Sequence, residues 1–276
     1  MSRPSEKRLT PKERASLAVI RFLNENPRAK EATMVFHRHV GRFWVWHSIK
    51  NLLHVEGLEA ARALQPPRGV LLCTNHRSFF DQYVISCLLV EDVPWVRRLM
   101  FPVRSNFFYE TWTGLLVNVV VGGGAMYPPI FRDASRADLN KQSLQTAIDY
   151  LQHPGNLVGV HPEGTRGKGP DPYQLLPAQP GVGQIALLSK ATIVPCFING
   201  LSNDFLGQLV SNFRDGGRSG DPVIIVFGAP IELGALAEGR PRPALYKRVA
   251  DRINEEITRL GERERALRAK LTHSAG

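Results

Sequence analysis

From residue 69 onward, short apolar runs alternate with longer amphipathic segments, and this alternation restricts the possible folds more than any other feature. Buried strands are predicted at 69–74, 95–103, 156–160, 192–198 and 223–227. Helices are predicted at 79–90, 136–152, 181–190 and 243–270. Strands that alternate with helices form α/β domains. We therefore predict one α/β domain with a central mixed, largely parallel sheet flanked by helices.

The N-terminal part of the chain lacks this alternation and predicts a helical extension. A first helix is predicted to end at Pro27, and residues 31–65 are predicted to be helical. Residues 1–50 hold 11 Lys and Arg against 4 Glu, a net charge of +7, whereas the whole chain has a net charge of +10. We divide the chain into a basic, aromatic-rich extension over 1–55 and an α/β domain over 56–276.

The basic excess predicts an anionic partner: a membrane surface, a nucleic acid or an acidic carrier protein. Residues 34–53 alternate aromatic with basic side chains, which suits the interface of a bilayer. The alternative is a helix that packs its aromatic residues on the domain. We expect no nucleic acid partner, because the chain has no recognisable nucleic-acid reader motif. The three widely spaced cysteines form no C-x-x-C pair, so neither a disulfide framework nor a cysteine-based metal site is expected.

Residues 111–131 form an uncharged stretch of nearly bilayer length. The segment contains Asn118, three consecutive glycines at 122–124 and the pair Pro128-Pro129. A membrane-spanning helix would have to accommodate all of these interruptions. We therefore predict a buried strand and loop here, and attachment to a membrane that is peripheral or interfacial.

The first chemical motif follows the predicted strand 69–74 and contains Asn75, His76, Ser78 and Asp81. If His76 lies in the loop and Asp81 in the first helical turn, the carboxylate can orient the imidazole. The positive end of the helix dipole then disfavours imidazolium, which leaves His76 neutral and able to accept a proton. Ser78 fits as the N-cap, with Asp81 three positions on as in a capping box. The alternative is a simple helix cap beside an ordinary loop histidine.

The second motif follows the predicted strand 156–160 and runs from His161 to Gly169. Glycines at 164, 167 and 169 permit a tight turn that lets backbone N–H groups approach a ligand. Arg166 offers a planar fork for a phosphate or carboxylate. A surface turn closed by an ion pair between Glu163 and Arg166 is the alternative. In open α/β sheets, ligands bind outside the carboxyl ends of the strands, where both loops are expected to lie.

Motifs of several other enzyme classes are incomplete in this chain. A Walker A loop ending at Gly167-Lys168 would need glycine at Pro162. No G-x-S-x-G elbow supplies a serine nucleophile. Cys73 lies within an apolar run, so a buried thiol is expected there.

Together, N-H-x-S-x-x-D at 75–81 and P-E-G-T-R at 162–166 resemble the lysophospholipid acyltransferase family, which includes the 1-acylglycerol-3-phosphate acyltransferases. The resemblance covers roughly residues 50–230, with weaker blocks at 124–132 and 193–198. It implies transfer of an acyl group from an acyl-CoA or acyl-carrier-protein thioester to a glycerol hydroxyl, without a further cofactor, a metal or an acyl-enzyme. We expect the protein at the cytoplasmic face of a membrane, because its cysteines indicate a reducing compartment and a lysolipid acceptor lies in a membrane.

The resemblance also assigns roles to individual residues. In the His-x4-Asp (HX4D) motif, His76 would be the general base and Asp81 its orienting partner. Asn75 and Ser78 would support them. The acceptor site would be formed by Glu163, Gly164, Thr165 and Arg166, with Arg166 and Arg132 on the acceptor phosphate.

Three positions depart from the family pattern. His161 replaces a bulky apolar residue, Gly167 replaces a serine, and Pro128-Pro129 interrupts the arginine block. These departures leave the acceptor open, so a lysolipid without a phosphomonoester, such as an aminolipid, is an alternative. A thioester hydrolase and a non-enzymatic module that binds lipid surfaces are further alternatives.

Overall fold

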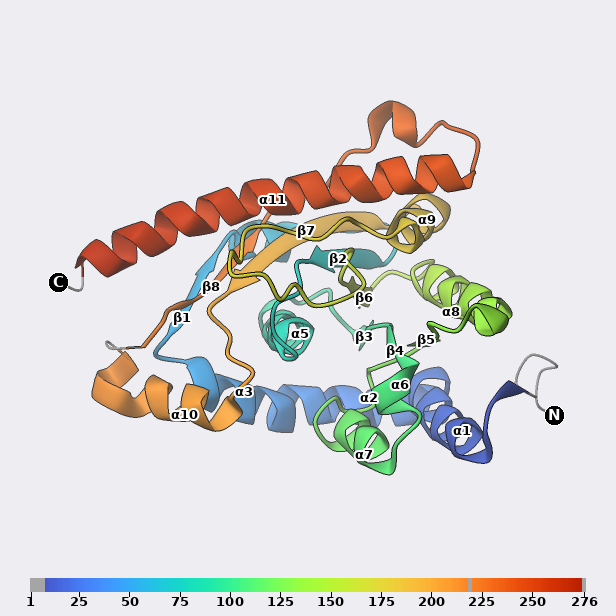
Figure 1. Ribbon diagram of the computed structural model, residues 1–276, viewed down its shortest axis with the longest axis horizontal. Helices are drawn as coiled ribbons and strands as arrows, with labels where there is room; N and C mark the ends of the chain where they lie inside the picture. Colours follow the sequence, from blue (N-terminus) through green and yellow to red (C-terminus); the bar gives the residue numbers. More distant parts are fainter. Residues whose placement is uncertain (1–7, 218–219, 275–276) are drawn as a thin grey trace.

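A six-stranded mixed sheet forms the centre of the molecule (Figure 1). The computed structural model describes residues 8–217 and 220–274, so the first seven residues of the predicted extension lie outside it. The strands, in spatial order, are β1 (Leu53–Glu56), β8 (Val223–Phe227), β7 (Thr192–Asn199), β2 (Val70–Thr74), β6 (Asn156–Val160) and β3 (Arg98–Met100).

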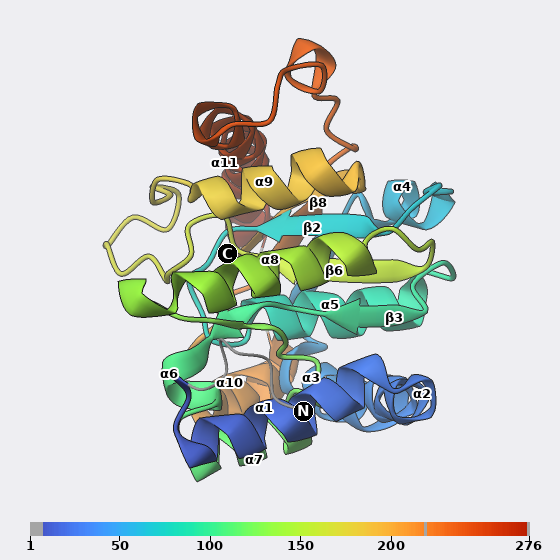
Figure 2. The same cartoon turned by 90° about the vertical axis from the view of Figure 1, so that its right-hand side faces the viewer.

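Four neighbouring strands, β7, β2, β6 and β3, are parallel to one another. β8 is antiparallel to β7, and β1 is parallel to β8. The predicted mixed, largely parallel sheet is therefore confirmed. The carboxyl ends of the four parallel strands meet at one edge of the sheet, which is on the left of Figure 2 for β2. A short second sheet pairs β4 (Val103–Arg104) with β5 (Pro129–Ile130).

Helices cover both faces of the sheet (Figures 1 and 2). One face carries α9 (Pro180–Ser189) and the long α11 (Pro243–Ser274), with α8 (Ala137–Tyr150) beside α9. The other face carries α5 (Asp81–Asp92). Below α5 lies a further layer made of α1 (Pro11–Glu25), α2 (Pro27–Phe36), η2 (His37–Gly41), α3 (Arg42–Ile49), α7 (Trp112–Val120) and α10 (Phe205–Phe213). The remaining short elements are α4 (Leu58–Ala63), α6 (Ser105–Phe108), η3 (Ala134–Arg136), η4 (Arg214–Gly217) and η5 (Gly234–Leu236).

The apolar runs that predicted strands form the core. Every residue of β2, β6 and β8 is buried, because helices cover both faces of a sheet of this class. The N-terminal helices share this core. Ile20 of α1 is fully buried, and the buried Lys30 of α2 donates hydrogen bonds to Asn24 and to the backbone carbonyl of Leu99.

The prediction of one helical stretch over 31–65 was wrong. The helix that begins at Pro27 passes through a π-helical turn into α3, and the strand β1 follows at Leu53. The first helix, α1, ends at Glu25, next to its predicted end at Pro27, and Pro27 itself begins α2 with Asn26 as the N-cap. β1 has only four residues at the edge of the sheet, which is too short to produce a clear alternation of apolar residues. It crosses the boundary drawn between residues 55 and 56.

The prediction of a buried strand and loop over 111–131 was wrong in its first half. Residues Trp112–Val120 form helix α7, capped by the Thr111 side chain, and only Pro129–Ile130 form a strand. The apolar residues Trp112, Leu115, Leu116, Val119 and Val120 do recur at helical spacing. The prediction missed this pattern because it treated the helix and the glycines and prolines at 122–129 as one interrupted segment. Within residues 8–217 and 220–274, no helix combines the length and the apolarity needed to cross a membrane.

Candidate active site

The carboxyl ends of the four parallel strands bring the two motifs together. His76 lies just after β2 and His161 just after β6, and these strands are neighbours in the sheet. The backbone N–H of Gly167 donates to the carbonyl of His76 at 2.8 Å, which joins the two loops directly. The loop after β7 contributes Asn203, and the segment after β3 contributes Arg104. All four strands therefore supply residues to one site.

His76 and Asp81 form the pair that the spacing predicted. The Nδ1 atom of His76 lies 3.2 Å from Oδ2 of Asp81. The same carboxylate oxygen accepts the backbone N–H groups of Arg77 at 2.6 Å and Ser78 at 2.7 Å. Since a carboxylate is the partner, we assign the ring proton to Nδ1. The Nε2 atom then carries the lone pair that can accept a proton.

Ser78 does not form the predicted N-cap. Helix α5 begins at Asp81, two residues later than expected, and has Phe80 as its N-cap residue. The Ser78 hydroxyl instead accepts the N–H of Phe80 and donates to the carbonyl of Ser202. Only the acidic half of the expected capping box is present, because Asp81 still accepts the backbone N–H of Ser78. Ser78 therefore ties the His76 loop to the loop after β7.

Asn75 and Glu163 hold the site together from within. The side chain of Asn75 is fully buried and exchanges two hydrogen bonds with the backbone of Ile198, as a neighbouring strand would. Glu163 is 2% exposed, and its two oxygens accept the backbone N–H groups of His76 and Leu176, each at 2.8 Å. Both side chains are satisfied by the backbone, so in this structure their contacts fix the position of His76.

Burial and nearby cations keep His76 neutral. Burial, followed by the charges of Arg166 and Arg104, lowers the pKa of His76 to about 3. Burial also raises the pKa of Asp81 to about 6, although His161 and the hydrogen bonds from Arg77 and Ser78 act against this rise. At neutral pH the pair therefore consists of a neutral imidazole and a carboxylate.

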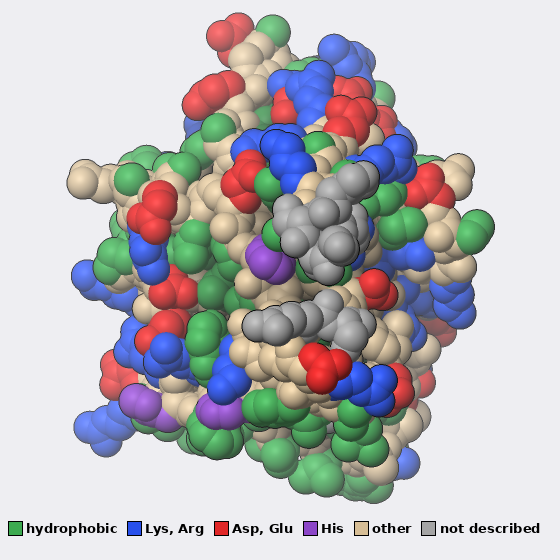
Figure 3. All heavy atoms as spheres, turned by 90° about the vertical axis from the view of Figure 1, so that its left-hand side faces the viewer, with side chains coloured by type: hydrophobic (Ala, Val, Ile, Leu, Met, Phe, Trp, Pro, Cys, Tyr) green, Lys and Arg blue, Asp and Glu red, His purple; other side chains and the backbone are tan. Residues whose placement is uncertain are grey.

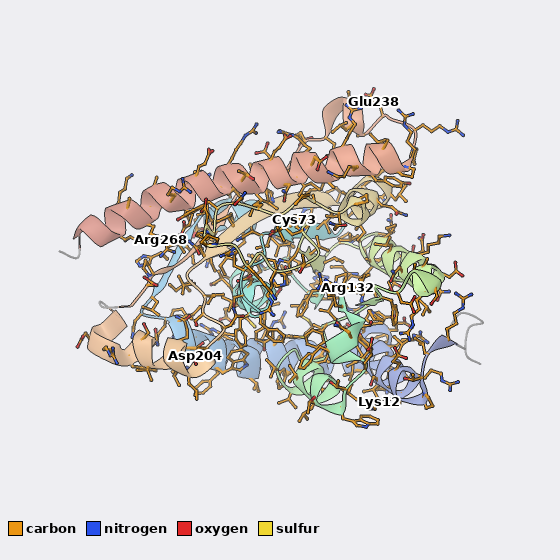
Figure 4. All side chains as sticks on the ribbon, in the orientation of Figure 1. Lys12, Cys73, Arg132, Asp204, Glu238 and Arg268 are labelled. Atoms are coloured by element: carbon orange, nitrogen blue, oxygen red, sulfur yellow. The ribbon has the colours of Figure 1, made fainter. Side chains whose placement is uncertain are left out.

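Three arginines form a cationic cluster beside the pair. The guanidinium of Arg104 donates from both Nε and Nη2 to the carbonyl of Gly164, and Arg166 donates to Asn203 at 3.0 Å. Burial and the charges of Arg132 and Arg166 lower the pKa of Arg104, which shows that these cations lie near one another. Arg132 is exposed and follows β5 (Figure 4).

Arg132 and Arg166 were predicted from the sequence, whereas Arg104 was not. Arg104 lies in a two-residue strand, β4, outside both motifs. Its pairing with β5, two residues before Arg132, brings it to the site. The sequence contained one indication of Arg104: it is a basic residue directly after the predicted strand 95–103.

Gly164 makes the turn that presents the second motif. Its φ of +63° lies in the left-handed region, and its N–H closes the turn onto the carbonyl of His161 at 2.9 Å. Gly164 is exposed and Thr165 is half-buried, so both can reach a ligand. Any other residue at this position would be strained by the positive φ, so the turn requires glycine.

The arrangement supplies a neutral base beside a cationic cluster. The three cysteines are buried, and burial raises the pKa of each thiol, so none of them is a ready nucleophile. Cys73 lies in the interior of the sheet layer (Figure 4). In the part of the chain that the structure describes, no three His, Cys, Asp or Glu side chains are grouped as metal ligands. A base of this kind can activate a hydroxyl on a ligand whose anionic group lies on the arginines.

Comparison with known proteins agrees with this geometry. The fold is similar to that of the 1-acyl-sn-glycerophosphate (LPA) acyltransferase PlsC from Thermotoga maritima, with a TM-score of 0.53 and 18% identity. The similarity covers 91% of this chain and 88% of the other. No curated protein matches the chain. A family model described as Acyltransferase matches residues 52–199, which is more than half of the chain and contains both motifs. The chain therefore belongs to the acyltransferase family.

Proposed function

We propose that the protein is a glycerolipid O-acyltransferase that moves a fatty acyl group from an acyl-CoA or acyl-carrier-protein thioester to a hydroxyl of a lysophospholipid such as 1-acylglycerol-3-phosphate. The observation that carries this proposal is the neutral His76, paired with Asp81 and adjacent to the arginine cluster. A hydroxyl acceptor with a phosphate matches both parts of the site. The acyl-CoA or carrier protein is a co-substrate, and the mechanism uses no other cofactor.

In the proposed mechanism, Nε2 of His76 accepts the proton of the acceptor hydroxyl. The oxygen attacks the thioester carbonyl, and the tetrahedral intermediate expels the thiolate, which takes the proton back from His76. The Asp81 carboxylate, 3.2 Å from Nδ1, stabilises the imidazolium that exists between these steps. No covalent acyl-enzyme forms.

The arginine cluster would hold the phosphate of the acceptor. Arg104 and Arg166 are bound to neutral partners, a carbonyl and an amide oxygen, so a phosphate can take over these donors. Arg132 would add a third cation from the exposed side. Gly164 and Thr165 would line the same acceptor site, while Glu163 would fix its loop. An acceptor without any phosphate would leave these cations unmatched, which favours a phosphate-bearing acceptor over an aminolipid.

An exposed apolar face suggests how the enzyme would reach its lipid substrate. Helices of the lowest layer in Figure 1 expose large apolar side chains, and Figure 3 shows such side chains gathered along the lower edge of the molecule. These residues are Val19, Phe22, Val35, Val40, Phe43, Trp46, Trp112, Leu116, Val120, Leu206, Val210 and Phe213, and we call them the apolar face. We propose that the apolar face docks on an anionic membrane surface at its cytoplasmic side.

Cations and aromatic rings on the apolar face fit a bilayer interface. Lys12 lies 5.9 Å from the ring of Trp112, and Lys50 lies 5.5 Å from the ring of Phe213. Aromatic side chains sit at the depth of lipid headgroups, where cations meet phosphates. The face includes α7 and α10. The docking surface that we propose is therefore wider than the predicted extension over 1–55.

An aromatic wall connects the catalytic loop with the surface. Phe79, three residues after His76, stacks on Phe108 of α6 with ring centroids 5.7 Å apart. Phe107 of the same helix is 41% exposed and contacts both rings. Such a wall suits an acyl chain. A lipid could therefore keep its chains in apolar surroundings while its headgroup reaches the arginines.

The decisive experiment is product analysis by mass spectrometry. A panel of lysolipids with and without a phosphomonoester would be offered with acyl-CoA and with acyl-carrier-protein donors. We expect acylation of the phosphate-bearing acceptors, and loss of this activity in His76→Ala and Asp81→Ala. The exposed His153→Ala serves as the matched control and should remain active. Full activity in a folded His76→Ala protein would refute the mechanism.

The same assay separates the alternatives. Free fatty acid formed without any lysolipid would indicate a thioester hydrolase, and vesicle binding without turnover would indicate a lipid-binding module. Docking is tested by co-sedimentation with vesicles that contain phosphatidylglycerol. Trp112→Ser and Leu206→Ser should each weaken binding by about tenfold, since each removes a large apolar group from the contact. Leu188→Ser on α9, outside the apolar face, should not.

A further inference from the structure

The imidazole of His161 lies flat on the imidazole of His76. The two ring centroids are 3.8 Å apart and the planes differ by 5°, so the rings are stacked face to face. His161 is the first residue after β6, and His76 is the second after β2, so the two adjacent strands bring the rings together. His161 is also one of the positions at which the sequence departs from its family pattern.

The backbone holds the ring of His161 in place. Its Nδ1 atom lies 2.9 Å from the carbonyl oxygen of Thr74 and 3.0 Å from that of Asn75. Both partners are acceptors, so Nδ1 must carry a proton. Because Thr74 and Asn75 immediately precede His76, the ring of His161 is tied to the segment that carries His76.

We infer that His161 is a positioning residue for His76: its fixed ring forms a wall that sets the plane of the imidazole against Asp81. This inference rests on the proposed role of His76 as the base. The contact from Nδ1 to Asp81 fixes one edge of the ring of His76 but does not by itself set the plane of the ring. A flat surface 3.8 Å away sets that plane and keeps Nε2 aimed at the acceptor hydroxyl.

The neutral state of His161 is part of this role. The face of a neutral ring attracts the imidazolium that forms on His76 during the reaction, whereas a second imidazolium would repel it. Burial, followed by the proximity of His76, lowers the pKa of His161 to about 3. The charged groups around the two rings are Asp81 of α5, Glu163 and Arg166 of the loop after β6, Arg104 of β4 and Arg77 of the His76 loop.

Two variants distinguish the effect of a flat ring at position 161 from the effect of side-chain volume alone. His161→Phe keeps a flat ring, and His161→Leu keeps an apolar side chain without one. We expect the phenylalanine variant, which keeps the ring but loses the Nδ1 donor to Thr74 and Asn75, to lose less than about fivefold in kcat. The leucine variant should lose about 30-fold in kcat, with the acceptor KM changed by less than twofold, because the wall aligns the base and does not touch the phosphate. Equal kcat values for the leucine variant and the wild type would overturn the inference, as would equal losses in both variants.

Proton NMR of the ring supplies a test that does not depend on activity. The Hε1 resonance of His76, assigned by its absence from His76→Gln, should be shifted upfield by the ring current of His161. His161→Phe should keep this shift and His161→Leu should lose it. A resonance at its ordinary position in the wild type would overturn the inference. Full activity of His76→Gln would instead refute the proposed function, whatever the position of the resonance.

Discussion

Replacement of Asp81 by asparagine should remove activity and yet make the protein more stable. The Asp81 side chain is 1% exposed, and its Oδ2 accepts the N–H groups of Arg77 and Ser78 and contacts Nδ1 of His76. An amide oxygen can accept the same bonds. The substitution therefore keeps the local geometry and removes mainly the buried negative charge.

The magnitude follows from the pKa of the carboxyl group. Burial raises it from an ordinary value of 3.8 to about 6, which corresponds to about 3 kcal/mol. Because the pKa is higher in the folded state, the fold binds this proton more tightly than the unfolded chain does. The contribution of Asp81 to the free energy of unfolding therefore falls as the pH rises from about 4 to about 6 and is constant above that range. Asp81→Asn should escape this loss, so its advantage should approach about 3 kcal/mol at pH 7 and nearly vanish at pH 4.

The assay is urea unfolding of both proteins at pH 4 and pH 7, together with acyl transfer at pH 7. Turnover should fall by about 10² to 10⁴-fold, because a neutral amide cannot stabilise the imidazolium of His76. Asp138→Asn is the control, since that carboxylate is exposed on α8 and should show neither effect. A variant less stable than the wild type at pH 7, or an advantage of the same size at both pH values, would refute the reasoning.

Three further predictions concern the acceptor, the pH profile and the packing. Arg104→Gln should raise the KM for a phosphate-bearing acceptor by about 10 to 100-fold, since a charge-assisted hydrogen bond contributes about 1.5 to 3 kcal/mol; an unchanged KM would exclude phosphate contact. The kcat/KM of the wild type should fall below about pH 6 as Asp81 takes up a proton, and a flat acid limb would contradict this. Gly183→Ala should lower the free energy of unfolding by about 1 to 3 kcal/mol, because a Cβ there would lie 1.9 Å from the Tyr246 carbonyl oxygen of α11. Urea titration measures this free energy, and an unchanged value would contradict the prediction.

The sheet could be predicted because its strands are buried on both faces. Strands such as β2 and β6 appear in the sequence as continuous apolar runs, and the two motifs follow them directly. Adjacent parallel strands then place the motifs at the same edge. The sequence therefore contained the main chemical pair, His76 with Asp81.

The parts that were missed depend on contacts between distant segments. Strand β1 is defined by its pairing with β8, and β4 by its pairing with β5, which brings Arg104 to the site. Helix α7 is an exception, because its apolar residues Trp112, Leu116 and Val120 do follow helical spacing. The stack of His161 on His76 joins residues 85 positions apart and follows from the register of β2 against β6. None of these contacts leaves a pattern within its own segment.

The carboxylate of Glu163 has a consequence for motion. One oxygen holds the backbone of His76 and the other that of Leu176, while Gly167 is bonded to the carbonyl of His76. The loops after β2 and β6 are therefore cross-linked into one stiff body and cannot open independently of each other. Parts of the site outside this body, such as helix α6 with Phe107, are not tied by these bonds. We therefore expect any rearrangement on substrate binding in those outer parts of the site and not at the catalytic base.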